Sequence, residues 1–402
     1  MENHIIINDP KNCCGCAACL NVCPKDAIVM IEDEAGFIYP KVRTELCVDC
    51  GMCKNVCVFK EENNGETKEL NVYAGVINDR ETLKKSSSGG VFSALANAVL
   101  ERGGVVFGAA WQEDFSLCHI AAHNSEELEK LRGSKYIQSS VGTTFREAKS
   151  LLDAGKFVCY SGTPCQISGL KSYLKKDYDN LLTIDLICHG VPSLKMFSDD
   201  IMYVSGEKPS ELKEIKFRDK SYGWGTKGSV TVKDKKIKYN AGTSPYYFYF
   251  LKGEIYRESC YNCRFPSEKR QGDITLGDYW GIKTELIQKL GNIEPDLGVS
   301  CVLVNTENGE KWLNAAKNAL YLTPSDRKSV EKRNGQLVHH SMPLPEHREL
   351  LEGYKASGFI SFRNGYKKHI KDHIIRGIKN LIPSKVKRKI NDFSDKVLKN
   401  EK

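Results

Sequence analysis

The stretch CCGCAACLNVCP (residues 13–24) decides how the N-terminal part of this chain folds. Its cysteines follow the spacing C-x2-C-x2-C-x3-C at Cys13, Cys16, Cys19 and Cys23. The same spacing returns in CVDCGMCKNVCV (residues 47–58), where Val58 replaces the proline that ends the first run. Three cysteines two residues apart wrap a cuboidal iron–sulfur cluster, and the fourth cysteine of each run ligates the other cluster. The doubled run therefore predicts two 4Fe–4S clusters.

This crossing of the fourth cysteines divides the eight thiols into two sets. The first cysteine set is Cys13, Cys16, Cys19 and Cys57. The second cysteine set is Cys47, Cys50, Cys53 and Cys23. Cys14 is an extra thiol in the first run and is expected to be a bystander. Structural zinc is the alternative, but zinc sites usually have two separated CxxC pairs rather than two triplets with a trailing cysteine. The runs resemble bacterial two-cluster ferredoxins over about residues 5–60.

Composition places the rest of the chain in a broad class. The chain has 402 residues, which predicts two or three domains, and sixteen cysteines. Its N-terminal residues do not resemble a secretion signal, so the cysteines predict metal ligation in a reducing, cytoplasmic compartment. The net charge of +8 comes from residues 361–402, which hold thirteen Lys or Arg and four Asp or Glu. The body is close to neutral, and this argues against nucleic-acid binding.

The pattern after the ferredoxin-like unit alternates between strand and helix. NVYAGVI (71–77), VVFGAAW (105–111) and LLTIDLICHG (181–190) are typical of buried strands, and residues 91–104 and 156–174 contain helical stretches. Such alternation predicts a mixed α/β fold. We therefore expect a two-cluster ferredoxin-like domain in residues 1–62, a mixed α/β domain in 70–345, and a basic, partly helical tail in 346–402.

Four further cysteines stand in loop-like contexts and form a candidate third cysteine set, namely Cys165, Cys188, Cys260 and Cys263. Cys165 and Cys188 each follow a predicted strand, at the edge where ligands of α/β sheets bind. A CxxC pair arriving there would complete a site for a third 4Fe–4S cluster. Zinc is one alternative. A nucleophilic Cys165 at a helix N-terminus is another. Cys118, Cys159 and Cys301 are expected to be core residues.

Several longer strings carry a family resemblance. The stretches SSSGGVFSALANAVLERGGVVFGAAW, YSGTPCQISGLKSYL, DLICHGVPS, CYNCRF and GDITLGDYWGI resemble the family of coenzyme F420 hydrogenase/dehydrogenase beta subunits over about residues 71–340. The resemblance implies a flavoprotein that binds FAD beside an iron–sulfur cluster. It also implies that the third cysteine set ligates that cluster.

Three segments are candidates for contacts with the flavin. Ser86–Gly90 precedes a helical pattern and suits a pyrophosphate, although a plain helix cap at Ser88 explains the same residues. The candidate cofactor contacts are Ser87, Ser88, Gly89, Gly90, Gly162, Thr163, Pro164, Arg270, Gly272 and Asp273. Arg270 would bind phosphate or anionic flavin, or form an exposed ion pair. Asp278, Tyr279 and Trp280 would line the pocket or pack a strand end. His189 is the candidate proton donor, with a structural hydrogen bond as the alternative.

These features predict an iron–sulfur flavoprotein oxidoreductase with three 4Fe–4S clusters and FAD. It would relay single electrons between a ferredoxin-like partner and FAD, for the reduction or oxidation of a small organic substrate. A non-catalytic electron-transfer subunit of a larger redox complex is the alternative. Ile370, Ile374, Ile378 and Leu381 recur at helical spacing in the tail, which suits either peripheral membrane contact or docking on the body.

Overall fold

The structure is a computed structural model that describes residues 9–59, 69–282, 294–343, 345 and 347–369. The polar stretch EENNGETKE (residues 61–69), whose composition is typical of a linker, lies almost entirely outside these ranges. The proposed membrane-contact residues between 370 and 381 also lie outside them. In the described parts of the chain, no helix is both long and apolar enough to cross a membrane.

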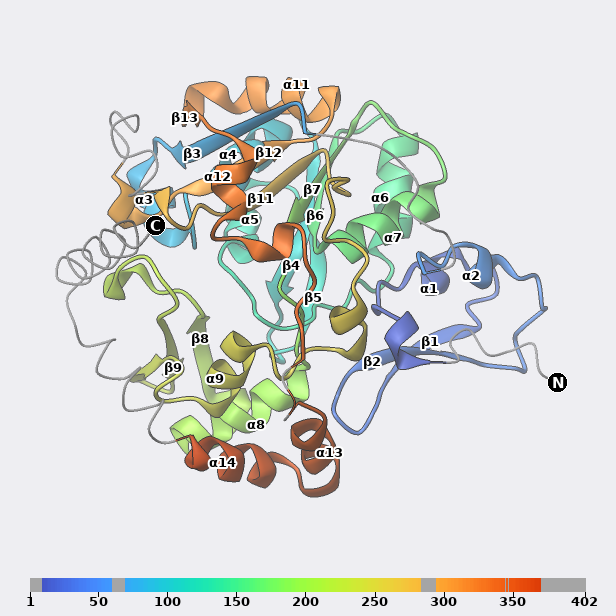
Figure 1. Cartoon of the computed structure of the whole chain (residues 1–402). Coiled ribbons are helices and arrows are strands. Elements are labelled where there is room, and N and C mark those ends of the chain that lie inside the picture. Colours follow the sequence, from blue (N-terminus) through green and yellow to red (C-terminus); the bar gives the residue numbers. More distant parts are fainter. Residues whose placement is uncertain (1–8, 60–68, 283–293, 344, 346, 370–402) are drawn as a thin grey trace, which may run out of the picture.

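The N-terminal unit lies at one side of the molecule (Figure 1). It contains two short helices and one antiparallel pair of strands: α1 (Ala18–Val22), α2 (Met52–Asn55), β1 (Ile28–Glu32) and β2 (Ile38–Val42). Each helix begins directly inside one of the two cysteine runs. Because α1 and α2 contact each other, the two runs lie side by side.

A large mixed sheet forms the centre of the body, with the strand order β13-β3-β12-β11-β7-β6-β4-β5. Its strands are β3 (Asn71–Ile77), β4 (Val105–Trp111), β5 (Leu117–Ala122), β6 (Val158–Gly162), β7 (Leu181–Leu186), β11 (Ile274–Asp278), β12 (Ser300–Val304) and β13 (Leu320–Pro324). The central strands β4, β6, β7 and β11 run parallel, and the others pair antiparallel with their neighbours. The carboxyl ends of the four parallel strands therefore meet at one edge of the sheet.

Helices cover both faces of this sheet. The helices around it are α3 (Arg80–Lys85), α4 (Val91–Leu100), α5 (Ser125–Leu131), α6 (Thr144–Asp153), α7 (Pro164–Leu174), α11 (Glu307–Ala316) and α12 (Arg327–Glu331). Along β4, Val106 and Ala110 pack into the core with α4 and α11, whereas Val105 and Phe107 pack into the core with α6 and α7. This period of two is what a strand with two buried faces requires.

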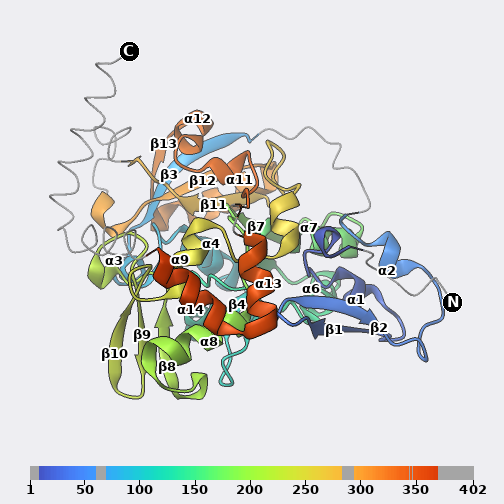
Figure 2. The same ribbon diagram turned by 60° about the horizontal axis from the view of Figure 1, so that its bottom comes forward.

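A second layer holds an aromatic core. It combines the three-stranded sheet β8 (Leu212–Lys216), β9 (Gly228–Val232) and β10 (Lys235–Tyr239) with α8 (Leu194–Ser205), α9 (Pro245–Lys252), α13 (His347–Ser357) and α14 (Phe359–Lys368). Figure 2 shows α13 and α14 lying beside α8 and α9. The part of the predicted basic tail that the structure describes is therefore packed on the body.

The N-terminal unit docks on the body mainly through its own main-chain carbonyls. Arg146 of α6 donates to the carbonyl oxygens of Asn21 (2.7 Å), Leu20 (2.9 Å) and Cys23 (2.9 Å). Ser172 of α7 donates to Val56 O at 2.8 Å. Further side chains of the body also donate to carbonyl oxygens of the unit, namely Gln138, Ser193, Lys195, Arg257 and Arg264. The position of the unit is thus fixed largely by its backbone path, with added side-chain contacts from Asn21 to Gly142 O and from Asp26 to Arg146.

Candidate functional site

The second cysteine set surrounds one cavity. Cys23, Cys47, Cys50 and Cys53 line a hollow of about 160 Å³ in the N-terminal unit. Its rim is exposed at Cys50 and at Val48. Cys23, although it belongs to the first run, thus lies with three thiols of the second run.

The members of the first cysteine set also lie close together. Cys19 interacts electrostatically with Cys16, Cys13 and Cys57, and Cys57 with Cys16. Burial raises the pKa of Cys13 and of Cys19, so forming thiolates here requires a positive partner. Cys57 comes from the second run, as the crossing pattern predicts.

The third cysteine set gathers where β6, β7 and the segment before β11 meet. Cys165 is the second residue of α7, and Cys188 follows β7 by two residues. Cys188 interacts with Cys260, Cys165 and Cys263, so the four thiols form one group. Thr163 and Gln166 form a capping box that begins α7, which fixes Cys165 at the edge of the sheet.

Cys14 lies between the first and third cysteine sets. Its buried thiol is within hydrogen-bonding reach of both Cys16 and Cys165. That hydrogen bond lowers the pKa of Cys165 to about 7, against the opposing effect of burial. On the same side, a Cβ at Gly169 of α7 would lie 3.0 Å from Cys16 Sγ. The first run and the start of α7 are thus in direct contact, and Cys14 lies at their junction.

A second cavity, of about 330 Å³, opens at the carboxyl edge of β4, β6, β7 and β11. Of the predicted cofactor residues, Ser87, Ser88, Gly90, Gly162, Thr163 and His189 line it, as do Asp278 and Trp280. Cys14, Cys165 and Cys188 also line this cavity. The cavity therefore runs from the SSSGG segment to the third cysteine set.

The SSSGG segment approaches the cavity at the N-terminus of α4. Gly90 is the N-cap, with a φ of 78° that favours glycine, so the alternative of a side-chain cap at Ser88 is wrong. Ser88 instead donates to Val299 O at 2.9 Å, and Ser87 accepts from Ser134 N at 2.7 Å. Gly89 does not line the cavity, because it packs against Gly75 and Ser300.

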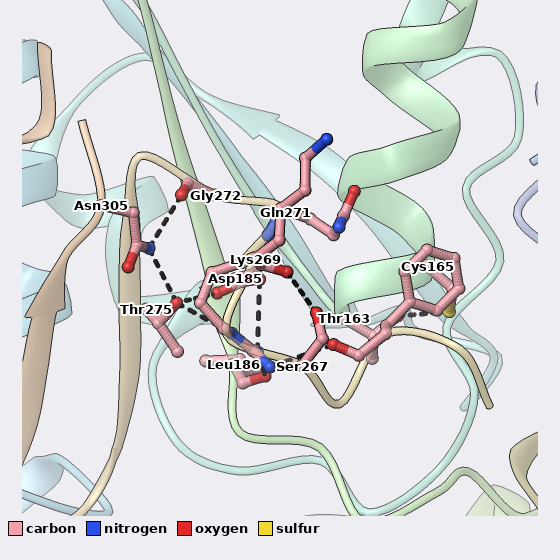
Figure 3. Close-up of polar contacts among 12 residues, drawn as sticks. Thr163, Cys165, Asp185, Leu186, Ser267, Lys269, Gln271, Gly272, Thr275 and Asn305 are labelled. Carbon is pink, nitrogen blue, oxygen red and sulfur yellow. Dashed lines mark hydrogen bonds and ion pairs between the residues drawn. The ribbon is translucent and has the colours of Figure 1, made fainter. Parts of the chain in front are cut away.

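Three predicted contacts lie elsewhere. Gly272 and Asp273 are at the amino end of β11, opposite the cavity, where Asn305 donates to Gly272 O at 2.9 Å (Figure 3). Asp273 accepts from Thr183 Oγ1 at 2.6 Å. Arg270 forms a buried ion pair with Asp185 at 3.3 Å and donates to Leu186 O at 3.0 Å. We therefore correct the assignment of Arg270, Gly272 and Asp273: they hold β11 against β7.

Pro164 and Tyr279 are not part of the cavity lining either. Pro164 is the first residue of α7, where its missing N–H is not needed. Tyr279 is buried, and its hydroxyl lies 2.5 Å from Ser325 Oγ. Both residues therefore support the elements around the cavity rather than its surface.

Sequence patterns missed several polar residues of the cavity. Arg218 pairs with Asp278, its guanidinium lies 5.1 Å from the Trp280 ring, and its buried Nη2 has no hydrogen-bond partner among the described residues. His119 lies 2.9 Å from Ser139 Oγ and 3.0 Å from Ser161 O, and burial lowers its pKa to about 4. Burial also lowers the pKa of Lys135 to about 7. None of these residues stands in a motif, so only the fold brings them together.

Three family models match parts of this chain. Residues 72–145 and 155–329 match the N-terminal and C-terminal parts of the coenzyme F420 hydrogenase/dehydrogenase beta subunit. Residues 12–60 match a 4Fe–4S dicluster domain.

Individual relatives are more distant. One component of the F420H2 dehydrogenase of Methanosarcina mazei is 22% identical over 356 residues, covering 81% of this chain and 91% of the relative. The coenzyme F420-dependent sulfite reductase of Methanocaldococcus jannaschii is 24% identical over 77% of this chain, which spans only 47% of that protein. A chain of the F420-reducing [NiFe] hydrogenase complex from Methanosarcina barkeri aligns with a TM-score of 0.45 at 17% identity, over 69% of this chain and 92% of that one.

Proposed function

Because this chain belongs to the family of coenzyme F420 hydrogenase/dehydrogenase beta subunits and carries a 4Fe–4S dicluster domain, we propose that it is an iron–sulfur flavoprotein oxidoreductase. In this proposal the first and second cysteine sets hold the two clusters of the dicluster domain. The third set holds another 4Fe–4S cluster, and FAD occupies the cavity beside it.

The geometry of the thiols supports clusters over zinc. A single zinc ion needs its ligands about 2.0–2.3 Å from one point. The second set instead surrounds a hollow of about 160 Å³, which suits a cuboidal cluster held at its corners.

Two features of the larger cavity fit FAD. The N-terminus of α4, reached through Gly90, presents unpaired backbone N–H groups that suit a pyrophosphate. The orphaned Nη2 of Arg218 is a buried donor that a carbonyl or phosphate oxygen of a ligand would satisfy. When bound, FAD supplies two-electron chemistry with an organic molecule and one-electron exchange with clusters.

The chain's own residues would position these groups in series. α1 and α2 hold the first and second sets next to each other. Cys14 and Gly169 bring the first set against Cys165 and α7. Cys165 and Cys188 then reach into the cavity lining. The proposed order of electron transfer is second set, first set, third set and FAD, and either direction is allowed.

One experiment tests both the organic substrate and the alternative that the chain is a non-catalytic electron-transfer subunit. Two relatives are named for coenzyme F420, so a deazaflavin is the first organic substrate that we propose. If the chain is instead a non-catalytic electron-transfer subunit, reduced F420 will not reduce its flavin in the absence of other proteins.

The observation that carries the proposal is that Cys165 and Cys188 of the third set line the same cavity as the SSSGG segment. The test is the content of iron, sulfide, zinc and flavin per chain after anaerobic purification. About twelve irons and one FAD are expected from three clusters and one flavin. About eight irons with zinc and no flavin would contradict the proposal and leave only the dicluster domain.

A further inference from the structure

Arg257 is buried at the junction of the N-terminal unit and the body. Its side chain comes from the body, three residues before Cys260, and its exposed fraction is 0%. Its Nε donates to Cys13 O at 2.6 Å, and its Nη2 donates to Ile38 O at 2.8 Å. The guanidinium also lies 4.0 Å from the centre of the Tyr39 ring. Arg257 therefore fixes both the first cysteine run and the β2 edge of the N-terminal unit.

Within the described ranges, no carboxylate forms an ion pair with this buried cation. The remaining contacts of Arg257 are with Gln138 Oε1 at 3.0 Å and with Cys13 Sγ at 3.5 Å. The groups that interact most strongly with its charge are Cys13, Tyr39, Cys14 and Cys260, none of which is a carboxylate. A buried charge without a partner is costly, and buried arginines are normally paired. Of these four groups, Cys13 accepts a hydrogen bond from the guanidinium through its sulfur, which makes the first cysteine set the nearest ligand set to this cation.

We infer that Arg257 is the buried counter-charge of the cluster held by the first cysteine set and that it raises the reduction potential of that cluster. The inference rests on the proposed function. A cluster gains one negative charge on reduction, and a nearby cation in a region of low dielectric constant stabilises the reduced form more than the oxidised form. The second set is exposed at Cys50, and the cations that line its hollow are the exposed Lys25 and the half-buried Lys54, whose charges are screened by solvent. Arg257 is fully buried, so its charge should raise the potential of the first cluster above the value that this cluster would have without it.

Arg146 provides a matched control for the purely structural explanation. It also comes from the body and also donates to carbonyl oxygens of the N-terminal unit. Unlike Arg257, it has a carboxylate partner, Asp26 at 2.7 Å, and its side chain is one-third exposed. Removing Arg146 weakens the docking without removing an unbalanced buried charge.

The experiment is an EPR-monitored redox titration of the full chain and its variants. The signal of the first cluster is identified by its loss in Cys57→Ser. In Arg257→Gln we expect the reduction equilibrium of that cluster to fall at least tenfold, which is about 59 mV for one electron. Arg257→Lys keeps the positive charge, so the reduction potential of the first cluster should stay close to its wild-type value. Arg146→Gln should leave the potential of the first cluster unchanged.

Gln138→Glu provides a second test if Arg257→Gln does not fold. A carboxylate at this position would face Arg257 Nη1 and neutralise it in place, so it should lower the same potential. An unchanged potential in Gln138→Glu, or equal shifts in Arg257→Gln and Arg146→Gln, would overturn the inference while the clusters remain assembled. A wild-type chain without 4Fe–4S signals would overturn the proposed function and this inference together.

Discussion

The two cysteine runs share left-handed backbone conformations at two equivalent positions, but the first run is covered by the body and the second is exposed to solvent. Gly15 and Ala17 of the first run have φ angles of 67° and 59°, and their counterparts Asp49 and Gly51 have 50° and 71°. Each run thus places two left-handed residues at equivalent positions, with one non-glycine in each. Cys14 is 8% exposed, however, whereas its counterpart Val48 is 56% exposed.

This difference shows how one loop geometry can serve two ends of a relay. The first run is covered by Gln138 and Arg257 of the body, and the second is open to solvent at Cys50. In the proposed function, the open run meets an external electron partner, and the covered run passes electrons to the third cysteine set. The surroundings of each loop decide its role.

Loss of the third cluster breaks the relay at its covered end and has the largest expected effect. Cys260→Ser removes one of four ligands, so iron should fall from about twelve to about eight per chain. Dithionite-reduced clusters should then no longer reduce the flavin, as followed by flavin absorbance. Cys118→Ser is the control, because Cys118 lies outside all three sets. Unimpaired flavin reduction in Cys260→Ser would rule out this route.

Replacing the fourth cysteine of each run by serine tests whether that cysteine ligates the cluster of the other run. Cys57→Ser should abolish the signal of the buried first cluster, although Cys57 belongs to the second run. Cys23→Ser should abolish that of the exposed second cluster. EPR spectra of the two reduced variants, with iron analysis, check this expectation. If each substitution removed the cluster of its own run, the crossed assignment would be wrong.

The pH dependence of the free energy of unfolding tests a buried group of the larger cavity, His119, against an exposed histidine. His119 has a folded pKa of about 4 because it is buried, below the usual value near 6.5. The unfolded chain therefore binds more protons between these values, so stability present above pH 6.5 is lost as the pH falls toward 4. The loss is about 3 kcal/mol at most.

Urea unfolding at several pH values measures this effect. His119→Gln should flatten the dependence between pH 6.5 and 4, whereas substitution of the exposed His123 by Gln should preserve it. A wild-type slope that is unchanged in His119→Gln would assign the effect to another group.

Alanine substitution of one glycine in each run compares the two runs directly, and the expected difference in stability is the smallest effect predicted. A Cβ at Gly15 would lie 2.5 Å from Gln138 Nε2, whereas a Cβ at Gly51 meets nothing within 4 Å. Both positions have positive φ, so Gly51→Ala should cost about 1–2 kcal/mol of backbone strain. Gly15→Ala should cost about 1–3 kcal/mol more, because it also overpacks the junction. Chemical denaturation of the two variants under anaerobic conditions measures the difference; equal losses would contradict the covered position of the first run.

Local sequence patterns predicted strands and helices of the body, because apolar residues recur at a different spacing in each type of element. The strands at 71–77 and 105–111 are confirmed as β3 and β4, and the helical stretch after Gly90 as α4. The structure places the thiols of each set near one another, and their assignment as cluster ligands stays a prediction. Strand and helix periodicity involves only residues that are close in sequence, so one sequence is enough to detect it.

The remaining parts of the site depend on contacts that no local pattern encodes. Arg257 and Cys13 are 244 positions apart, and Arg218 reaches the cavity from the second layer. The misassigned Arg270, Gly272 and Asp273 show the converse error. Gly272 and Asp273 lie at the amino end of β11, opposite the cavity, and the guanidinium of Arg270 is held by Asp185 and by Leu186 O.

The body recognises the N-terminal unit largely by its backbone. Donors such as Arg146 and Ser172 contact carbonyl oxygens, which every residue type provides. The outer side chains of the unit are therefore free to diverge without loss of docking, provided that the loop path is kept. The unit is in this sense an exchangeable module, and a different two-cluster ferredoxin with the same cysteine spacing should seat on the same body and bring with it a surface for another electron partner.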